Sequence, residues 1–185
     1  MWNIIQAADA GALIFIQEHL RASLLTAVLI FYTTLGNNGL LWIGISLLLL
    51  CFKRTRTAGL LALVAMLLGL LCCNVALKNI VSRPRPYLSV ESLLPLLAPP
   101  DPDSFPSGHT CAAFAAAGIW LRTLPSRFFR AAALVAAAVM GFSRMYVGLH
   151  YPTDVLAGMC IGLLCAFIIW HIYLKVTNSP KRKPV

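Results

Sequence analysis

The chain has few charged side chains: 11% of its 185 residues are charged, and only six are acidic. Soluble domains carry about 25% charged residues, so this composition excludes an ordinary soluble domain. Hydrophobic residues make up 59% of the chain. Several apolar stretches reach the roughly 20 residues that a membrane-spanning helix needs. We therefore expect one integral-membrane domain over residues 1–185.

Two other patterns are missing. The N-terminal segment contains Asp9, Glu18 and His19 and lacks both a basic start and a small-residue cleavage site. We therefore expect no cleavable signal peptide. The six cysteines lack the spacing of metal ligands, and Cys72 and Cys73 are adjacent, so we expect no cysteine metal site.

The net charge of +9 is compatible with nucleic-acid binding, but its distribution favours another explanation. Three basic clusters lie in short connections or a tail beside apolar stretches, as the positive-inside rule predicts for cytoplasmic segments. We therefore expect no nucleic-acid partner and a cytoplasmic C-terminus. The clusters are Lys53, Arg54 and Arg56; Arg122, Arg127 and Arg130; and Lys175, Lys181, Arg182 and Lys183.

The apolar segments predict an all-α, polytopic helical membrane bundle of five or six spans. Residues 1–20 predict an amphipathic helix in the membrane interface. Residues 23–52 are too long for one untilted span, and Gly-Asn-Asn-Gly at 36–39 interrupts them. They form either two helices meeting at a break or one long tilted helix. Later spans are expected at 57–80, 107–121, 128–146 and 152–174, with a basic cytoplasmic tail at 176–185.

If the basic clusters are cytoplasmic, the alternation of spans places three polar segments together on the opposite face. These are residues 83–105, the helix start at His109, and the loop around His150. Ionisable residues at the edge of a bilayer-length apolar segment are functional candidates. We therefore expect one extracytoplasmic site, although an Arg–Asp ion pair in a polar loop is the simpler explanation for Arg144 and Asp154 taken alone.

The residues of this expected site suit a phosphate group. Lys78, Arg85 and Arg144 supply cations, and arginine matches phosphate oxygens with two parallel hydrogen bonds. Ser107 and Gly108 lie at a helix start, where free backbone N–H groups favour an anion. An N-cap role for Ser107 is the structural alternative.

Two histidines add the chemistry of a phosphoryl transfer, which needs a nucleophile and an acid for the leaving oxygen. His109 and His150 both lie in the expected site, whereas His19 and His171 have no such neighbours. Asp154 follows His150 by four residues, at the start of a helix. An aspartate there can accept the ring N–H and leave the other nitrogen free to attack.

Three motifs in this order resemble the signatures of the type 2 phosphatidic acid phosphatase superfamily, which includes bacterial undecaprenyl diphosphate phosphatases. All three motifs are complete, each lies at the end of an expected span, and together they are specific. They are Lys78 with Arg85-Pro86, then Pro106-Ser107-Gly108-His109, then Ser143-Arg144 with His150 and Asp154.

The resemblance implies a lipid phosphatase that needs no metal or other cofactor. His150 would attack phosphorus and form a phosphohistidine, Asp154 would orient it, and His109 would protonate the leaving oxygen. The phosphate-binding residues would be Lys78, Arg85, Ser107, Gly108 and Arg144. Arg83, outside the strict motif, is a candidate contact to the headgroup or to a second phosphate.

The apolar chain and the resemblance favour a lipid substrate that enters from the bilayer of a bacterial plasma membrane. Undecaprenyl diphosphate, converted to undecaprenyl phosphate, is the first candidate. Phosphatidylglycerophosphate and phosphatidic acid are the alternatives, since no residue distinguishes a prenyl chain from a diacylglycerol. A membrane protein that only binds or transports anionic lipid is the non-enzymatic alternative, and the oligomeric state stays open.

Overall fold

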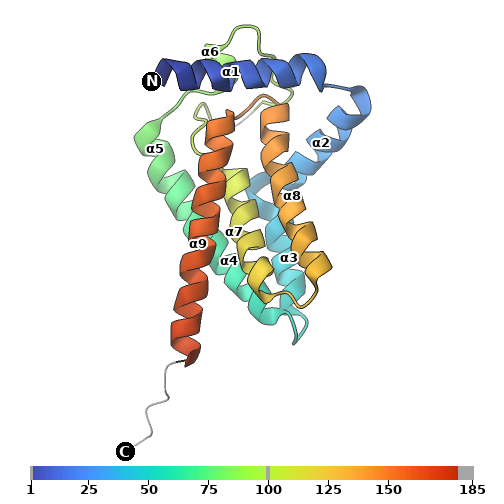
Figure 1. Ribbon diagram of the computed structural model, residues 1–185, viewed down its shortest axis with the longest axis vertical. Coiled ribbons are helices and arrows are strands. Elements are labelled where there is room, and N and C mark those ends of the chain that lie inside the picture. The colour runs from blue at the N-terminus through green and yellow to red at the C-terminus, as the bar shows by residue number, and fades with distance from the viewer. Residues whose placement is uncertain (1, 99–100, 179–185) are drawn as a thin grey trace, which may run out of the picture.

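The computed structural model describes residues 2–98 and 101–178, which form an all-α bundle with one helix lying across its end (Figure 1). That helix is α1, Trp2–His19, which covers the segment expected to lie in the interface. The all-α helical bundle is therefore confirmed. Most of the tail expected at 176–185 lies outside the described residues.

Residues 23–52 form two helices that meet at a break. Helix α2 spans Ser23–Leu35, the short segment η1 spans Asn37–Gly39, and α3 spans Leu40–Leu50. The two halves are bent by 55°. Asn38 and Gly39 both have positive φ, a conformation that asparagine and glycine adopt most readily. Of the two alternatives, the structure therefore shows the break.

The next long helix carries an irregularity just before Lys78. Helix α4, Arg56–Leu70, continues into the π-helical segment η2, Leu71–Leu77, and then into α5, Lys78–Val81. Segments of π-helix are rare and are frequently found at functional sites. After α5 the chain turns through Ser82 in the left-handed region, and Pro86 begins the short helix α6, Pro86–Ser89.

Helix α7, Gly108–Thr123, lies in the centre of the bundle, packed against α4, α8 (Arg127–Tyr146) and α9 (Pro152–Asn178). Four alanines of α7, at positions 113 and 115–117, are fully buried. Two glycines of α9, Gly158 and Gly162, face the α7 backbone with no room for a methyl group. Small residues let membrane helices approach closely. This close packing holds the start of α7 against the start of α9.

The structure shows fewer candidate spans than the five or six expected. Within residues 2–98 and 101–178, three helical stretches are long and apolar enough: Arg56–Val81, Arg127–Tyr146 and Pro152–Asn178. The bent pair Ser23–Leu35 with Asn37–Leu50 makes a fourth if the pair is one span. Helix α7, which was expected to be a span, has only 16 residues. Because neighbouring helices surround α7, it does not need an apolar surface of bilayer length.

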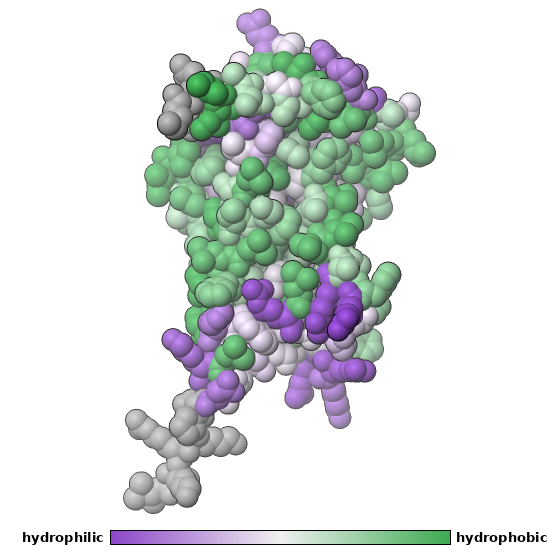
Figure 2. All heavy atoms as spheres, viewed as in Figure 1, coloured by the Kyte–Doolittle hydropathy of each residue, from purple (hydrophilic) through white to green (hydrophobic). Residues whose placement is uncertain are grey.

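The two ends of the bundle differ in chemistry. The connections α3–α4 and α7–α8 and the C-terminal end of α9, which carry the basic clusters, lie at one end (Figure 1). The loops around Arg85 and His150 and the start of α7 lie at the other end, beside α1. Hydrophobic residues cover the middle of the surface, and hydrophilic residues gather toward the ends (Figure 2). The expected meeting of three distant polar segments is thus confirmed.

Candidate active site

A cavity of about 800 Å³ lies where these polar segments meet. Its polar lining includes six of the residues expected from the sequence: Lys78, Arg85, Gly108, His109, Arg144 and His150. The other three, Arg83, Ser107 and Asp154, are buried and do not line it. The structure therefore brings all nine residues into one region but divides them between the cavity and the layer behind it.

Lys78 and Arg85 share one carboxylate, that of Asp101. Asp101 Oδ1 lies 2.7 Å from Lys78 Nζ and 3.0 Å from Arg85 Nη2. Arg85 also donates through Nε to the carbonyl oxygen of Asp101 and through Nη1 to that of Leu149. A carboxylate oxygen bridging two cations occupies a place that suits a phosphate oxygen.

The Asp101 side chain is 39% exposed, so water reaches this ion pair. Partial burial acts to raise the pKa of Asp101, but the hydrogen bond and charge of Lys78 and the charge of Arg85 outweigh it and hold that pKa below its ordinary value. Asp101 is therefore ionised at neutral pH and competes with any anion for the two cations.

Arg144 points into the cavity from the last turn of α8. Its Nη1 donates to Thr33 Oγ1 of α2 over 2.7 Å, which fixes one side of the guanidinium. Its Nε is buried and has no hydrogen-bond partner among the described residues. A buried donor without a partner is costly, and an anion in the cavity would satisfy it.

The start of α7 combines a cap with an open cavity wall. Ser107 is fully buried; its Oγ accepts from Thr110 N over 3.4 Å and lies 2.9 Å from Thr110 Oγ1. Ser107 is therefore the N-cap of α7, the structural alternative considered from the sequence. Gly108 faces Asn74 Oδ1 so closely that a Cβ would approach within 2.7 Å. Glycine keeps this stretch of backbone accessible to the cavity.

His109 lies in the first turn of α7 and lines the cavity with His150. Its Nε2 lies 3.0 Å from Asn37 Oδ1, at the break between α2 and α3. An amide oxygen only accepts hydrogen bonds, so this contact places a proton on Nε2. The break after α2 therefore places the Asn37 side chain where it orients the His109 ring.

The tautomer of His150 follows from its neighbours. Its Nδ1 lies 2.7 Å from the carbonyl oxygen of Ser104, which only accepts, so Nδ1 carries a proton. In the neutral ring Nε2 then holds a lone pair, 3.4 Å from Arg85 Nη1. Burial, followed by the positive charges of Arg144 and Arg85, lowers the pKa of His150 well below its ordinary value. His150 is therefore a neutral base or nucleophile.

Asp154 lies behind His150 rather than in direct hydrogen bond with it. Its Oδ2 is 3.9 Å from His150 Nδ1 and accepts from Tyr151 N over 2.8 Å, and its Oδ1 accepts from Arg83 Nη1 over 2.7 Å. The ring hydrogen expected to reach Asp154 goes to Ser104 instead. Burial disfavours the ionised form of Asp154, and the ion pair with Arg83 opposes that effect and favours a negative charge close to His150.

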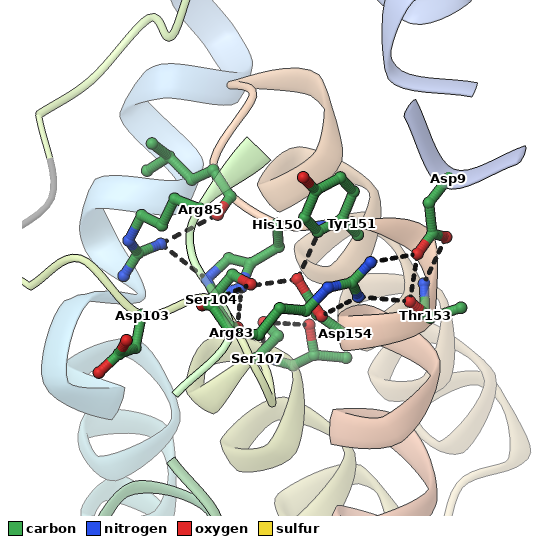
Figure 3. A network of polar contacts seen from close by, with 12 residues as sticks. Asp9, Arg83, Arg85, Asp103, Ser104, Ser107, His150, Tyr151, Thr153 and Asp154 are labelled. Atoms are coloured by element: carbon green, nitrogen blue, oxygen red, sulfur yellow. Dashed lines mark hydrogen bonds and ion pairs between the residues drawn. The ribbon is translucent and has the colours of Figure 1, made fainter. Parts of the chain in front are cut away.

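Arg83 was considered as a contact to the substrate headgroup, but it does not line the cavity. Its guanidinium is 5% exposed and lies between Asp154 and Asp9 of α1, with Nη2 2.8 Å from Asp9 Oδ2 (Figure 3). It also lies over the ring of Tyr151, 3.8 Å from the ring centre. Arg83 is thus directed away from the cavity, toward a buried layer of charges.

Sequence reasoning did not find five residues that contact the site. These are Asp9, Thr33, Asn37, Asp101 and the carbonyl of Ser104. A signal existed for Asp9, because the alternation of spans that joins the three polar segments also places residues 1–20 on their face. Contacts of Thr33 and Asn37 depend on the direction of a helix break, which spacing does not give.

Comparison with known proteins places the chain in one family. The chain matches the PAP2 superfamily over residues 58–178. It is 31% identical over 144 residues to an undecaprenyl-diphosphatase of Sulfolobus acidocaldarius, covering 78% of this chain and 68% of the relative. It is 28% identical over 178 residues to undecaprenyl-diphosphatase BcrC of Bacillus subtilis, covering 88% and 89%.

A solved structure shares the architecture. The transmembrane PAP2-type phosphatidylglycerolphosphate phosphatase from Bacillus subtilis superposes with a TM-score of 0.77 at 29% identity, over 96% of this chain and 90% of the other. Family membership favours an enzyme over a protein that only binds or transports lipid. The cations, the histidines and these likenesses lead to one conclusion: the chain belongs to the PAP2 superfamily and is an integral-membrane lipid phosphate phosphatase.

Proposed function

We propose that the protein hydrolyses undecaprenyl diphosphate to undecaprenyl phosphate and inorganic phosphate. The observation that carries this proposal is the match to two undecaprenyl-diphosphatases, one of which is covered over 89% of its length. The cavity supports it, because its polar end holds three cations, Lys78, Arg85 and Arg144, enough to bind a diphosphate.

The cavity also has an apolar wall that suits a lipid chain. Ile43 of α3 and Leu63, Met66, Leu67 and Leu70 of α4 line it below the polar residues. Leu67 and Leu70 are exposed on the surface of the bundle, which in a membrane is the lipid-facing surface. A prenyl chain lying against this wall keeps its contact with the bilayer while the headgroup reaches the histidines.

In the first half of the proposed reaction, the lone pair of His150 Nε2 attacks the terminal phosphorus. The bond from that phosphorus to the bridging oxygen breaks. His109, which carries a second proton on Nδ1 once the diphosphate balances the cavity cations, gives that proton to the leaving undecaprenyl phosphate and becomes neutral. Lys78, Arg85, Arg144 and the Gly108 amide stabilise the charge on the transferring phosphoryl group. Asp101 leaves Lys78 and Arg85 as the substrate binds.

In the second half, water attacks the phosphohistidine at phosphorus. His109, now without its proton, accepts one from the water, and the bond between phosphorus and Nε2 breaks. Inorganic phosphate leaves and both histidines return to their starting states. Asp154 contributes negative charge 3.9 Å from Nδ1, where the phosphorylated imidazole ring is positive.

The site is proposed to face the extracytoplasmic side of a bacterial plasma membrane. The support is the position of the basic connections at the opposite end of the bundle, since such connections favour the cytoplasm. A phosphatase reporter active outside the cell, fused after Arg122, would contradict this orientation.

The test is phosphate release from purified protein in detergent with EDTA, comparing undecaprenyl diphosphate, phosphatidylglycerophosphate and phosphatidic acid. We expect the highest kcat/KM for undecaprenyl diphosphate, and the same rate with and without EDTA. The similar protein of known structure is described as a phosphatidylglycerolphosphate phosphatase, so that lipid is the second candidate substrate. A higher kcat/KM for phosphatidylglycerophosphate would replace the first assignment by the second.

A further inference from the structure

The buried charges behind His150 form a continuous chain that reaches the N-terminal helix. Arg83 Nη1 donates to Asp154 Oδ1 and to Thr153 Oγ1, each over 2.7 Å, and Nη2 donates to Asp9 Oδ2 over 2.8 Å. Asp9, Arg83 and Asp154 are 3%, 5% and 0% exposed. Two carboxylates therefore share one guanidinium in a buried region (Figure 3).

We propose that Asp9 and Arg83 are positioning residues for the proposed phosphohistidine reaction, so that helix α1 is a working part of the active site. This inference rests on the proposed function. Arg83 holds Asp154, Asp9 holds Arg83, and Asp154 supplies the negative charge that His150 requires when its ring becomes positive.

Arg83 reaches His150 by two routes. Its guanidinium fixes Asp154 Oδ1, which leaves Oδ2 directed at the Tyr151 N–H and toward His150 Nδ1. Its carbonyl oxygen accepts from Ser104 N over 2.7 Å, and the Ser104 carbonyl in turn accepts the His150 ring hydrogen. Orientation and tautomer of the nucleophile thus both depend on where Arg83 lies.

The charge of Arg83 has a separate effect. A fully buried carboxylate without a cation is costly and tends to take up a proton, which would remove the charge beside His150. The ion pair with Arg83 opposes this uptake of a proton. Asp9 engages the other nitrogen of the fork and accepts from Thr153 N over 3.2 Å, so only Nη1 of Arg83 faces Asp154.

This network connects three parts of the chain that are distant in sequence. Asp9 comes from α1, Arg83 from the turn after α5, and Thr153 and Asp154 from the first turn of α9. Buried networks of this kind respond as a unit to the loss of one member. We therefore expect displacement of α1 to change the chemistry at His150.

The experiment compares Asp9→Asn, Arg83→Gln, the double variant and Arg83→Lys with wild type. Terminally ³²P-labelled undecaprenyl diphosphate is mixed with excess enzyme in a single turnover, so the rate constant does not depend on how much protein is folded. We expect decreases of about tenfold for Asp9→Asn and about 100-fold for Arg83→Gln, with the double variant no slower than Arg83→Gln. Arg83→Lys, which keeps the charge, should recover part of the loss.

Inhibition by inorganic phosphate separates positioning from loss of structure. The inhibition constant should stay within about twofold of wild type in Asp9→Asn, because the cavity cations are untouched. Glu18→Gln, which removes an exposed carboxylate from the same helix, is the matched control and should match wild type in both measurements.

Unaltered single-turnover rate constants in both single variants would overturn the inference, as would fully additive losses in the double variant, because Asp9 would then act independently of Arg83. Equal loss of phosphate inhibition and rate would indicate a structural role and overturn it too. Wild-type protein that turns over no lipid phosphate would contradict the proposed function itself, and the inference with it.

Discussion

Two arginines, separated by one proline, lie on opposite sides of His150. Arg85 is 3% exposed and Arg83 is 5% exposed, so burial does not distinguish them. Their partners do. Arg85 holds Asp101, a side chain 39% exposed on a loop, whereas Arg83 holds Asp9 and Asp154, which are both buried. One guanidinium has an exchangeable partner and the other has permanent ones.

This difference indicates what each side of His150 does. On the cavity side, cations lie beside the partly exposed carboxylate of Asp101, which a phosphate can displace. Arg144 Nε has no hydrogen-bond acceptor among the described residues. On the buried side, the Arg83 guanidinium donates to two carboxylates and a hydroxyl, all from the protein itself. We therefore expect the cavity side to bind the phosphoryl group and the buried side to position the proposed nucleophile, His150.

The largest effect is expected at the residue between the two sides. His150→Asn removes the nucleophile and should reduce phosphate release by about 10⁴-fold or more. His171→Asn alters an exposed histidine near the other end of α9 and is the matched control. Phosphate release by His150→Asn at the wild-type rate would end the proposed mechanism.

A charge-conserving pair of substitutions tests the two arginines directly. Arg85→Lys should lower kcat/KM by about 100-fold, because an ammonium group cannot reproduce the paired donors that meet the phosphoryl oxygens. It should also weaken competitive inhibition by inorganic phosphate, whereas Arg83→Lys should leave that inhibition unchanged. Equal effects of the two variants on phosphate inhibition would remove the distinction between the two sides.

Asp101 is expected to have a smaller effect, with the opposite sign. Asp101→Asn removes the carboxylate that competes for Lys78 and Arg85, so inorganic phosphate should inhibit about threefold to tenfold more tightly. Asp103→Asn, in the same loop, is the control and should not change the inhibition constant. Weaker phosphate binding by Asp101→Asn would show that Asp101 assists the anion rather than competing with it.

The smallest effect concerns pH. The pKa of His150 is lowered on folding, so the unfolded chain takes up a proton below about pH 6.5 that the folded protein does not. Stability from this group is therefore present above about pH 6.5 and is lost as pH falls below it, by up to about 1.4 kcal/mol per pH unit. Thermal unfolding between pH 7.5 and 5.5 should show a smaller decrease in His150→Gln than in wild type. Identical decreases would contradict a lowered pKa.

The motifs predicted the cavity side of the site well, because its residues lie at fixed spacings at the ends of helices. The three polar segments were expected on one face of the bundle, and five of their charged or histidine side chains do line one cavity: Lys78, Arg85, His109, Arg144 and His150. The contacts on the buried side, between Arg83, Asp9 and Asp154, were not predicted. Spacing does not tell which of two neighbouring arginines turns inward, and the partner of Arg83 comes from a helix 74 residues earlier.

The fold was predicted to a similar extent. Apolar length located the long helices. The span expected at 107–121 corresponds to α7, which has 16 residues and is enclosed by other helices, so length and composition alone do not make it a candidate span. The break at 36–39 was visible as a Gly-Asn-Asn-Gly sequence. Its consequence, the contact of Asn37 with His109, depends on a 55° bend that composition does not specify.

The central claim is that the phosphoryl group is transferred to His150 Nε2. The most direct measurement is a rapid quench under basic conditions of the protein turning over terminally ³²P-labelled undecaprenyl diphosphate, followed by mass spectrometry of the labelled peptide. The account predicts an acid-labile label on His150 that appears and decays at the rate of turnover and is absent from His150→Asn. Label on His109, or turnover at the wild-type rate by His150→Asn, would contradict it.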